Sequence, residues 1–339
     1  MMKKTDESAS LMRKGTFFCI AADTMFGLSS FFLRGLTVHQ VSADWTLMIK
    51  ELIVALASIA VLCASRKEER IFPPFKILAA IFAIAFLGET VGLRSLITSY
   101  GLIGIVLANP VIRTFTILGS ILLAAIFLHE RPGKYRWISM IVLVFSLFLL
   151  AFGQLGVVRG PNSFSFEIGD RNRIFLIGFF WAALAGIGYA LYSILMRGIL
   201  RRKKTAVDTD IDGSKTDLKS ENREGSVSIF LITAIVCGYG SLSGGIVLWT
   251  QKGFSGMIDV PDPAWTIVLL AGTASFFAIW LKSLAFRYAT AGKVAVFSVL
   301  QLVLGAVLGM IFYQEPSDVL IWTAIGLTVF GISLSARTE

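Results

Sequence analysis

The chain is a succession of apolar runs, and the length of these runs limits the possible fold more than any other feature. At a rise of about 1.5 Å per residue, a helix of roughly 20 apolar residues spans the ~30 Å hydrocarbon core of a bilayer. Inside lipid, every backbone polar group must find a partner within the protein, which leaves only helices or a closed barrel. Runs of this length are typical of helices. The sequence therefore predicts an all-α polytopic membrane protein.

We count ten such runs and expect ten transmembrane helices. They cover residues 15–36, 45–64, 77–96, 102–128, 137–153, 174–195, 227–249, 264–284, 292–312 and 319–335. Aromatic residues near the ends of the runs, such as Trp45, Trp249 and Trp322, fit an interfacial belt. Only 16% of the residues are charged, whereas a soluble domain has roughly a quarter.

The runs form two copies of one unit. At a constant offset Leu93, Ser95, Leu96, Tyr100 and Gly104 align with Leu281, Ser283, Leu284, Tyr288 and Gly292, and, after short slips, Gly119 aligns with Gly305 and Glu130 with Glu315. An earlier piece aligns Arg34 with Arg197 and Gly35 with Gly198. Five spans per copy is an odd number, so the second copy must enter the membrane the other way up. We therefore expect two inverted five-helix repeats, the architecture of many secondary transporters, whose binding site lies between the halves near mid-membrane.

The repeats define the predicted domains. A polar tail covers residues 1–14, the first repeat 15–160 and the second repeat 173–336. The second repeat is interrupted at 201–226 by a segment with almost no large apolar residue, which we expect to be a disordered linker. The N-terminal tail is too polar for the apolar core of a signal peptide, so the first run is expected to remain in the protein.

Basic residues predict the orientation. With the N-terminus inside, 23 of the 31 Lys and Arg residues fall in inner segments, as the positive-inside rule requires. Both termini are then cytoplasmic, and a plasma or bacterial inner membrane is the expected location. The loop after Glu130 carries Arg131 and Lys134, whereas the loop after Glu315 has no base, as expected of inverted copies. The net charge of +9 lies in loops and does not indicate nucleic acid binding.

Two carboxylates inside predicted spans are candidates for coupling and for substrate binding, because ionisable residues in a membrane are costly and often functional. Asp23 shares a helix face with Gly27 and Ser30. It could take a proton or bind a cationic group, or it could be the structural partner of a Lys or Arg. Glu89 lies in the third run; burial favours its protonated form, which suits proton coupling and equally suits a helix–helix hydrogen bond.

The fourth run has the sharpest polar pattern. A stripe at spacings i, i+4, i+7 and i+11 is formed by Asn109, Arg113, Thr116 and Ser120. Pro110 removes one backbone donor and predicts a kink. Arg113 facing lipid would cost several kcal/mol, so it must face a cavity, where it could hold a carboxylate or phosphate, or pair with Glu89 or Glu51.

The second copy adds further candidates. Gln301 lies in the ninth run, followed by Gly305 and Gly309, whose spacing allows close helix contact. Tyr189 and Trp280 could stack on a planar substrate or be simple packing residues.

Lys50 and Glu51 are adjacent, so we expect them to point in different directions, with Lys50 extending toward the outer interface.

Signatures of enzymes and cofactors are missing from the sequence. Neither histidine, His39 or His129, belongs to an HExxH pattern, and no CxxC, GxSxG or P-loop pattern occurs. The three cysteines lie in apolar runs, where small core residues are expected. We therefore predict no enzyme, no metal and no cofactor.

These features together resemble the drug/metabolite transporter superfamily, EamA-like type. The matching residues are Pro110, Glu130 and Arg131 in the first repeat and Glu315 in the second. The chain departs from the pattern at Ser298, which replaces a proline. The resemblance implies ten spans around a central cavity, alternating access, and often export of amino acids, drugs or other metabolites.

We therefore expect a secondary transporter of a small polar metabolite, such as an amino acid or related zwitterion, working as an exporter or exchanger. A nucleotide-sugar or sugar-phosphate carrier is an alternative, as is a non-transporting scaffold or sensor. The expected partners are the small-molecule substrate and the lipid bilayer, and a homodimer is left open.

Overall fold

The computed structural model describes residues 2–64, 75–127, 133–154, 158–160, 163–165, 170–208, 229–253, 255–288, 291–315 and 318–335. The first half contains α1 (Met2–Val38), α2 (Ala43–Ala64), α3 (Phe75–Ala85), the π-helix η1 (Phe86–Leu93), α4 (Arg94–Phe127) and α5 (Lys134–Gln154). The second half contains α6 (Asp170–Asp208), α7 (Ile229–Lys252), α8 (Ser255–Ile258), α9 (Asp262–Tyr288), α10 (Ala291–Tyr313) and α11 (Val319–Ser335).

A short hairpin lies between the halves, which the all-α prediction did not include. Strand β1 (Val158–Gly160) pairs antiparallel with β2 (Ser163–Ser165), with Val158 opposite Ser165. Part of the predicted linker is helical, because α6 continues to Asp208. The rest of the linker, and the motif residues Glu130 and Arg131, lie outside the described residues.

The helices have the length and surface of membrane spans. Within the described residues, seven helices are long and apolar enough to cross a bilayer, and two shorter apolar helices cover Phe297–Tyr313 and Val319–Ser335. Large apolar side chains such as Ile141, Leu242 and Ile311 are more than 60% exposed, an arrangement that suits contact with lipid. The protein is thus a polytopic helical membrane protein.

The predicted third and fourth runs lie in one continuous apolar stretch of 49 residues, Leu78–Ile126, about twice the length that one span requires. Within it, Gly104 has φ 79° and ψ 169°, so two helical segments meet at this residue. A conformation of this kind is almost restricted to glycine. Gly104 lies at the third residue of the predicted fourth run, so the break falls just after the boundary predicted at 97–101.

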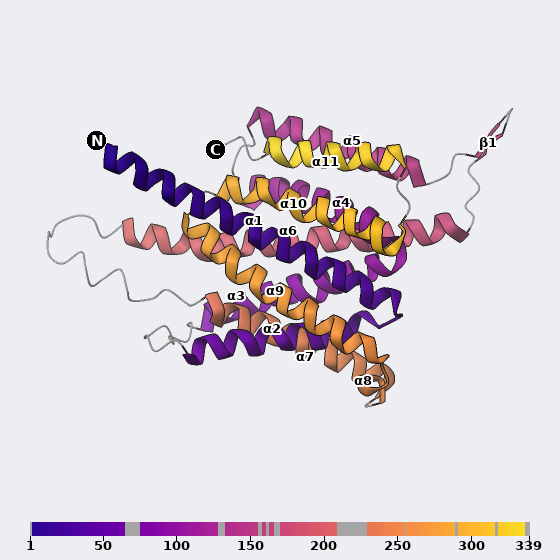
Figure 1. Cartoon of the computed structure of the whole chain (residues 1–339), viewed down its shortest axis with the longest axis horizontal. Helices are drawn as coiled ribbons and strands as arrows, with labels where there is room; N and C mark the ends of the chain where they lie inside the picture. The colour runs from indigo at the N-terminus through magenta and orange to yellow at the C-terminus, as the bar shows by residue number, and fades with distance from the viewer. Residues whose placement is uncertain are drawn as a thin grey trace.

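The helices pack in specific pairs. Helix α1 packs along α9 and α10, α4 packs along α6, α2 along α7, and α5 along α11. Figure 1 shows α5 and α11 side by side, and places the N- and C-termini at the same end of the bundle. Figure 1 also shows that α6 starts near β1, at the opposite end from the start of α1, so these two helices run in opposite directions.

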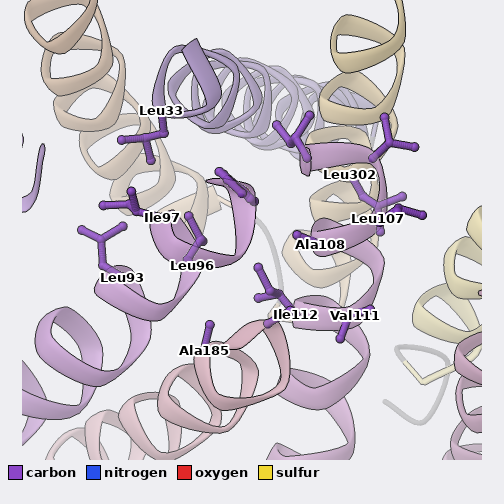
Figure 2. Close-up of a cluster of buried hydrophobic side chains, with 14 of the residues drawn as sticks. Leu33, Leu93, Leu96, Ile97, Leu107, Ala108, Val111, Ile112, Ala185 and Leu302 are labelled. Atoms are coloured by element: carbon purple, nitrogen blue, oxygen red, sulfur yellow. The ribbon is translucent and has the colours of Figure 1, made fainter. Parts of the chain in front are cut away.

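The central apolar core joins both halves. Figure 2 shows Leu33 of α1, Leu96 and Ile112 of α4, Ala185 of α6 and Leu302 of α10 in one buried cluster. Helix α10 approaches α4 closely: a Cβ atom on Gly305 or Gly309 would meet Ile105. The predicted close contact through these two glycines is confirmed. This core holds the polar stripe of α4 against α1 and α10.

Candidate functional site

Arg113 and Gln301 lie at the junction of α4, α10 and α1. The Arg113 guanidinium donates a hydrogen bond to Gln301 Oε1, and Gln301 Nε2 donates to Ser30 Oγ at 3.4 Å. Arg113 is part-buried and Gln301 is 8% exposed. Across the described residues, Arg113 forms no ion pair with a carboxylate. Two predicted site residues, one from each half of the chain, are therefore in contact, and the cation Arg113 has the neutral amide of Gln301 as its partner.

Asn109, one turn away on α4, has a partly satisfied amide. Tyr100 donates its hydroxyl hydrogen to Asn109 Oδ1 at 2.5 Å, whereas Asn109 Nδ2 is buried without a partner among the described residues. Thr116 donates to the carbonyl oxygen of Ile112 on its own helix. Asn109 therefore offers a free donor at the junction, while the Thr116 hydroxyl hydrogen is already used.

Asp23 forms an ion pair across α1 and α9. Its Oδ1 accepts a hydrogen bond from Lys282 Nζ at 2.9 Å, and Asp23 is fully buried. The same ammonium lies over the ring of Phe26, 5.3 Å from its centroid. Of the two predicted roles for Asp23, this geometry fits the structural partner of a cation. No sequence pattern identifies Lys282 as this partner.

A second charged cluster joins α2, η1 and α7. Lys50 Nζ pairs with Glu51 Oε1, and these residues are only 6% and 2% exposed. The expectation that Lys50 extends to the interface is wrong. The flexible four-carbon side chain of lysine lets its ammonium reach the neighbouring carboxylate, and this removes the cost of burying either charge alone.

Glu89 completes this cluster. The Glu51 and Glu89 carboxylates and the Cys237 thiol have ligand atoms within 4.8 Å of one another, and Glu89 Oε2 is buried with no partner among the described residues. Such a set could hold a metal ion, but the Lys50 ammonium already lies against Glu51 and would repel one. Two carboxylates beside one ammonium leave a surplus of one formal negative charge when all three groups are ionised.

The π-helix η1 positions Glu89. A Cβ on Gly88 would meet Tyr192 at 2.9 Å, and one on Gly92 would meet Tyr189 at 3.0 Å, so α6 packs directly on η1. Single π-turns are frequent at functional sites, and nothing in the sequence pattern predicted this one.

Trp280 lies apart from these clusters. It is 39% exposed and packs against Phe277, with ring centroids 6.1 Å apart. Its place in a substrate site stays a prediction.

Comparison with known proteins finds a related family. Residues 223–337 match the EamA-like transporter family, which belongs to the drug/metabolite transporter superfamily. The predicted resemblance is confirmed over this segment, which lies in the second half of the chain. The apolar helices and this match together indicate an integral multi-pass membrane protein.

A solved crystal structure of another protein has a similar fold. It superposes with a TM-score of 0.56 at 14% identity, covering 94% of this chain and 95% of that chain. No curated protein matches the sequence.

Proposed function

We propose that this EamA-like chain is a secondary transporter in which Arg113 binds the anionic group of a small polar solute. The observation that carries the proposal is that this guanidinium bonds to a neutral amide and forms no ion pair with a carboxylate of the described residues. In contrast, Arg34, Arg94 and Lys282 each face a carboxylate within 3 Å. An uncompensated cation in a membrane costs several kcal/mol, so an anionic group of a solute would lower the energy of the site.

The helix packing supports the predicted ten spans in two inverted repeats. Under the sequence alignment of the repeats, α1 corresponds to α6, η1 to the C-terminal part of α9, and α4 to α10. The contacts of α1 with α9 and α10 then correspond to those of α6 with η1 and α4. The pairs α2–α7 and α5–α11 each map onto themselves. This symmetry favours two halves that rock about a site between them, as alternating access requires.

Glu89 is the coupling group in this proposal. A proton on Glu89 neutralises the surplus negative charge beside Lys50 and Glu51. Binding of a solute carrying an ammonium group would compensate the same charge, so proton and solute would compete for it. Arg113 and Glu89 then account for the two ends of a zwitterion such as an amino acid. Asp23 is assigned to its pair with Lys282 and not to coupling.

A sugar-phosphate or nucleotide-sugar carrier is the second candidate, because a phosphate would bind Arg113 equally well. We place the chain in the plasma or inner membrane with both termini in the cytoplasm, as the distribution of basic residues favours.

Gln301→Glu is the sharpest test. The new carboxylate would occupy Arg113 permanently without changing the shape of the side chain. In proteoliposomes, after a thermal-shift screen of amino acids and phosphorylated sugars has identified a ligand, we expect Gln301→Glu to abolish uptake and the thermal shift while the protein stays folded. Ser30→Ala, which removes the 3.4 Å hydrogen bond from Gln301 and adds no charge, is the control. Normal uptake by Gln301→Glu would refute the role of Arg113.

A further inference from the structure

Glu315, just after the end of α10, binds the start of a helix in the other half of the protein. Its carboxylate accepts hydrogen bonds from the backbone N–H groups of Ile105 at 3.0 Å and Val106 at 2.8 Å. These are the first amides of the helical segment after Gly104, which have no partner within their own helix. A carboxylate at this position also compensates the positive end of the helix dipole.

Gly104 makes this approach possible. A Cβ atom at Gly104 would lie 2.5 Å from the carboxylate carbon and from both oxygens of Glu315. The glycine is therefore required twice, once for its positive φ and once for the space that the carboxylate occupies.

Arg34 of α1 closes the network. Its Nε donates to Glu315 Oε1 at 2.7 Å, and its NH1 group donates to the carbonyl oxygen of Tyr100 at 2.7 Å. The guanidinium also lies over the ring of Tyr313, whose hydroxyl donates to the carbonyl oxygen of Phe31 at 2.9 Å. The three elements α1, α4 and α10 are thus tied together at one end of the bundle by a single carboxylate.

We infer that this Arg34–Glu315–Gly104 network is the latch that closes the outer side of the protein. The inference rests on the proposed function, in which two halves separate to admit solute. The network joins elements of both repeats, whereas the ion pair of Arg94 with Asp44 joins two helices of the first repeat. In the closed state the two side chains are largely buried, at 16% and 5% exposure. On opening, both charges would be hydrated, and this hydration offsets part of the pairing energy that is lost. A reversible closure needs such a balance.

The sequence repeats the same three residue types. Arg197, Gly292 and Glu130 are the repeat equivalents of Arg34, Gly104 and Glu315. The side chains of Arg197 and Glu130 lie outside the described part of the chain.

The test measures access from outside, independently of transport. Ser30 is 5% exposed and lies one turn from Arg34, beside Gln301. Ser30→Cys, in a chain whose three native cysteines are replaced, would be labelled with a membrane-impermeant maleimide in sealed right-side-out vesicles. We expect Glu315→Gln to speed labelling about tenfold. Asp44→Asn, which breaks an ion pair within the first repeat, is the matched control and should leave the rate unchanged.

Equal labelling rates with and without Glu315→Gln would overturn the latch, and so would an equal acceleration by Asp44→Asn. If Glu315→Gln does not yield a monodisperse protein, Arg34→Lys is used with the same two outcomes. Hydrogen exchange of the Ile105 and Val106 amides in the otherwise native protein gives a second readout and should accelerate in Glu315→Gln. Loss of the latch would leave the Gln301→Glu result unaffected, so the two proposals fail separately.

Discussion

Replacement of Gly104 by alanine should be among the most damaging single-methyl changes in this protein. The added Cβ would enter the space of the Glu315 carboxylate, at 2.5 Å from three of its atoms. It would also force alanine into a backbone conformation with φ 79° and ψ 169°. Both effects act at the point where α4 changes direction.

The cost can be worked out from these two effects. A non-glycine residue in this region of φ and ψ costs about 1–3 kcal/mol. Displacing the carboxylate weakens hydrogen bonds to a charged acceptor, each of which contributes roughly 1.5–3 kcal/mol. If one of the two amide hydrogen bonds is lost, the total is about 2.5–6 kcal/mol.

Unfolding titrations in mixed detergent micelles, followed by circular dichroism, measure this loss. Gly326→Ala is the matched control, because no atom lies within 4 Å of the position of its Cβ. We expect that variant to change stability by less than about 1 kcal/mol. If Gly104→Ala is as stable as Gly326→Ala, neither the strain nor the carboxylate contact has the importance we give it.

Two further predictions concern helix pairs and use the same titration. Lys282→Met leaves Asp23 buried without its cation and should lower the free energy of unfolding by about 3–5 kcal/mol. Adding Asp23→Asn should recover part of this loss. A double variant less stable than Lys282→Met would contradict the pairing. Gly244→Ala should destabilise the α2–α7 contact by about 1–3 kcal/mol, because its Cβ would lie 2.8 Å from a backbone oxygen of α2. Gly245→Ala is the control, because its Cβ would meet only the flexible side chain of Met48, at 3.2 Å. Equal costs at the two glycines would refute this account of the packing.

Hydrophobicity was sufficient to predict a polytopic helical membrane protein. Each apolar run lies largely within described helices. The break at Gly104 falls at the third residue of the fourth run, just after the gap predicted at 97–101. The spacing of Gly305 and Gly309 predicted a close contact that the structure contains. These features are properties of a single segment or a single helix face, so they can be predicted without knowing which helices pack beside it.

The partners of buried charges could not be predicted in the same way. Whether Asp23 meets Lys282, or Arg113 meets Gln301, depends on the rotation and depth of two helices far apart in the sequence. The wrong prediction for Lys50 has a similar origin. Adjacent residues leave a helix in different directions, but the long lysine side chain can still bend back to the neighbouring carboxylate. The repeated Arg34 and Glu315 positions were the one available signal for the latch.

The inverted repeat is the central claim, and the side of the membrane on which equivalent loops lie tests it most directly. Gly133 and Asp318 are both exposed and occupy equivalent positions after Glu130 and Glu315. Single cysteines at these positions can be labelled in sealed vesicles with an impermeant reagent. The account predicts that Asp318→Cys reacts only from outside and Gly133→Cys only from inside. Reaction of both cysteines from the same side would contradict it.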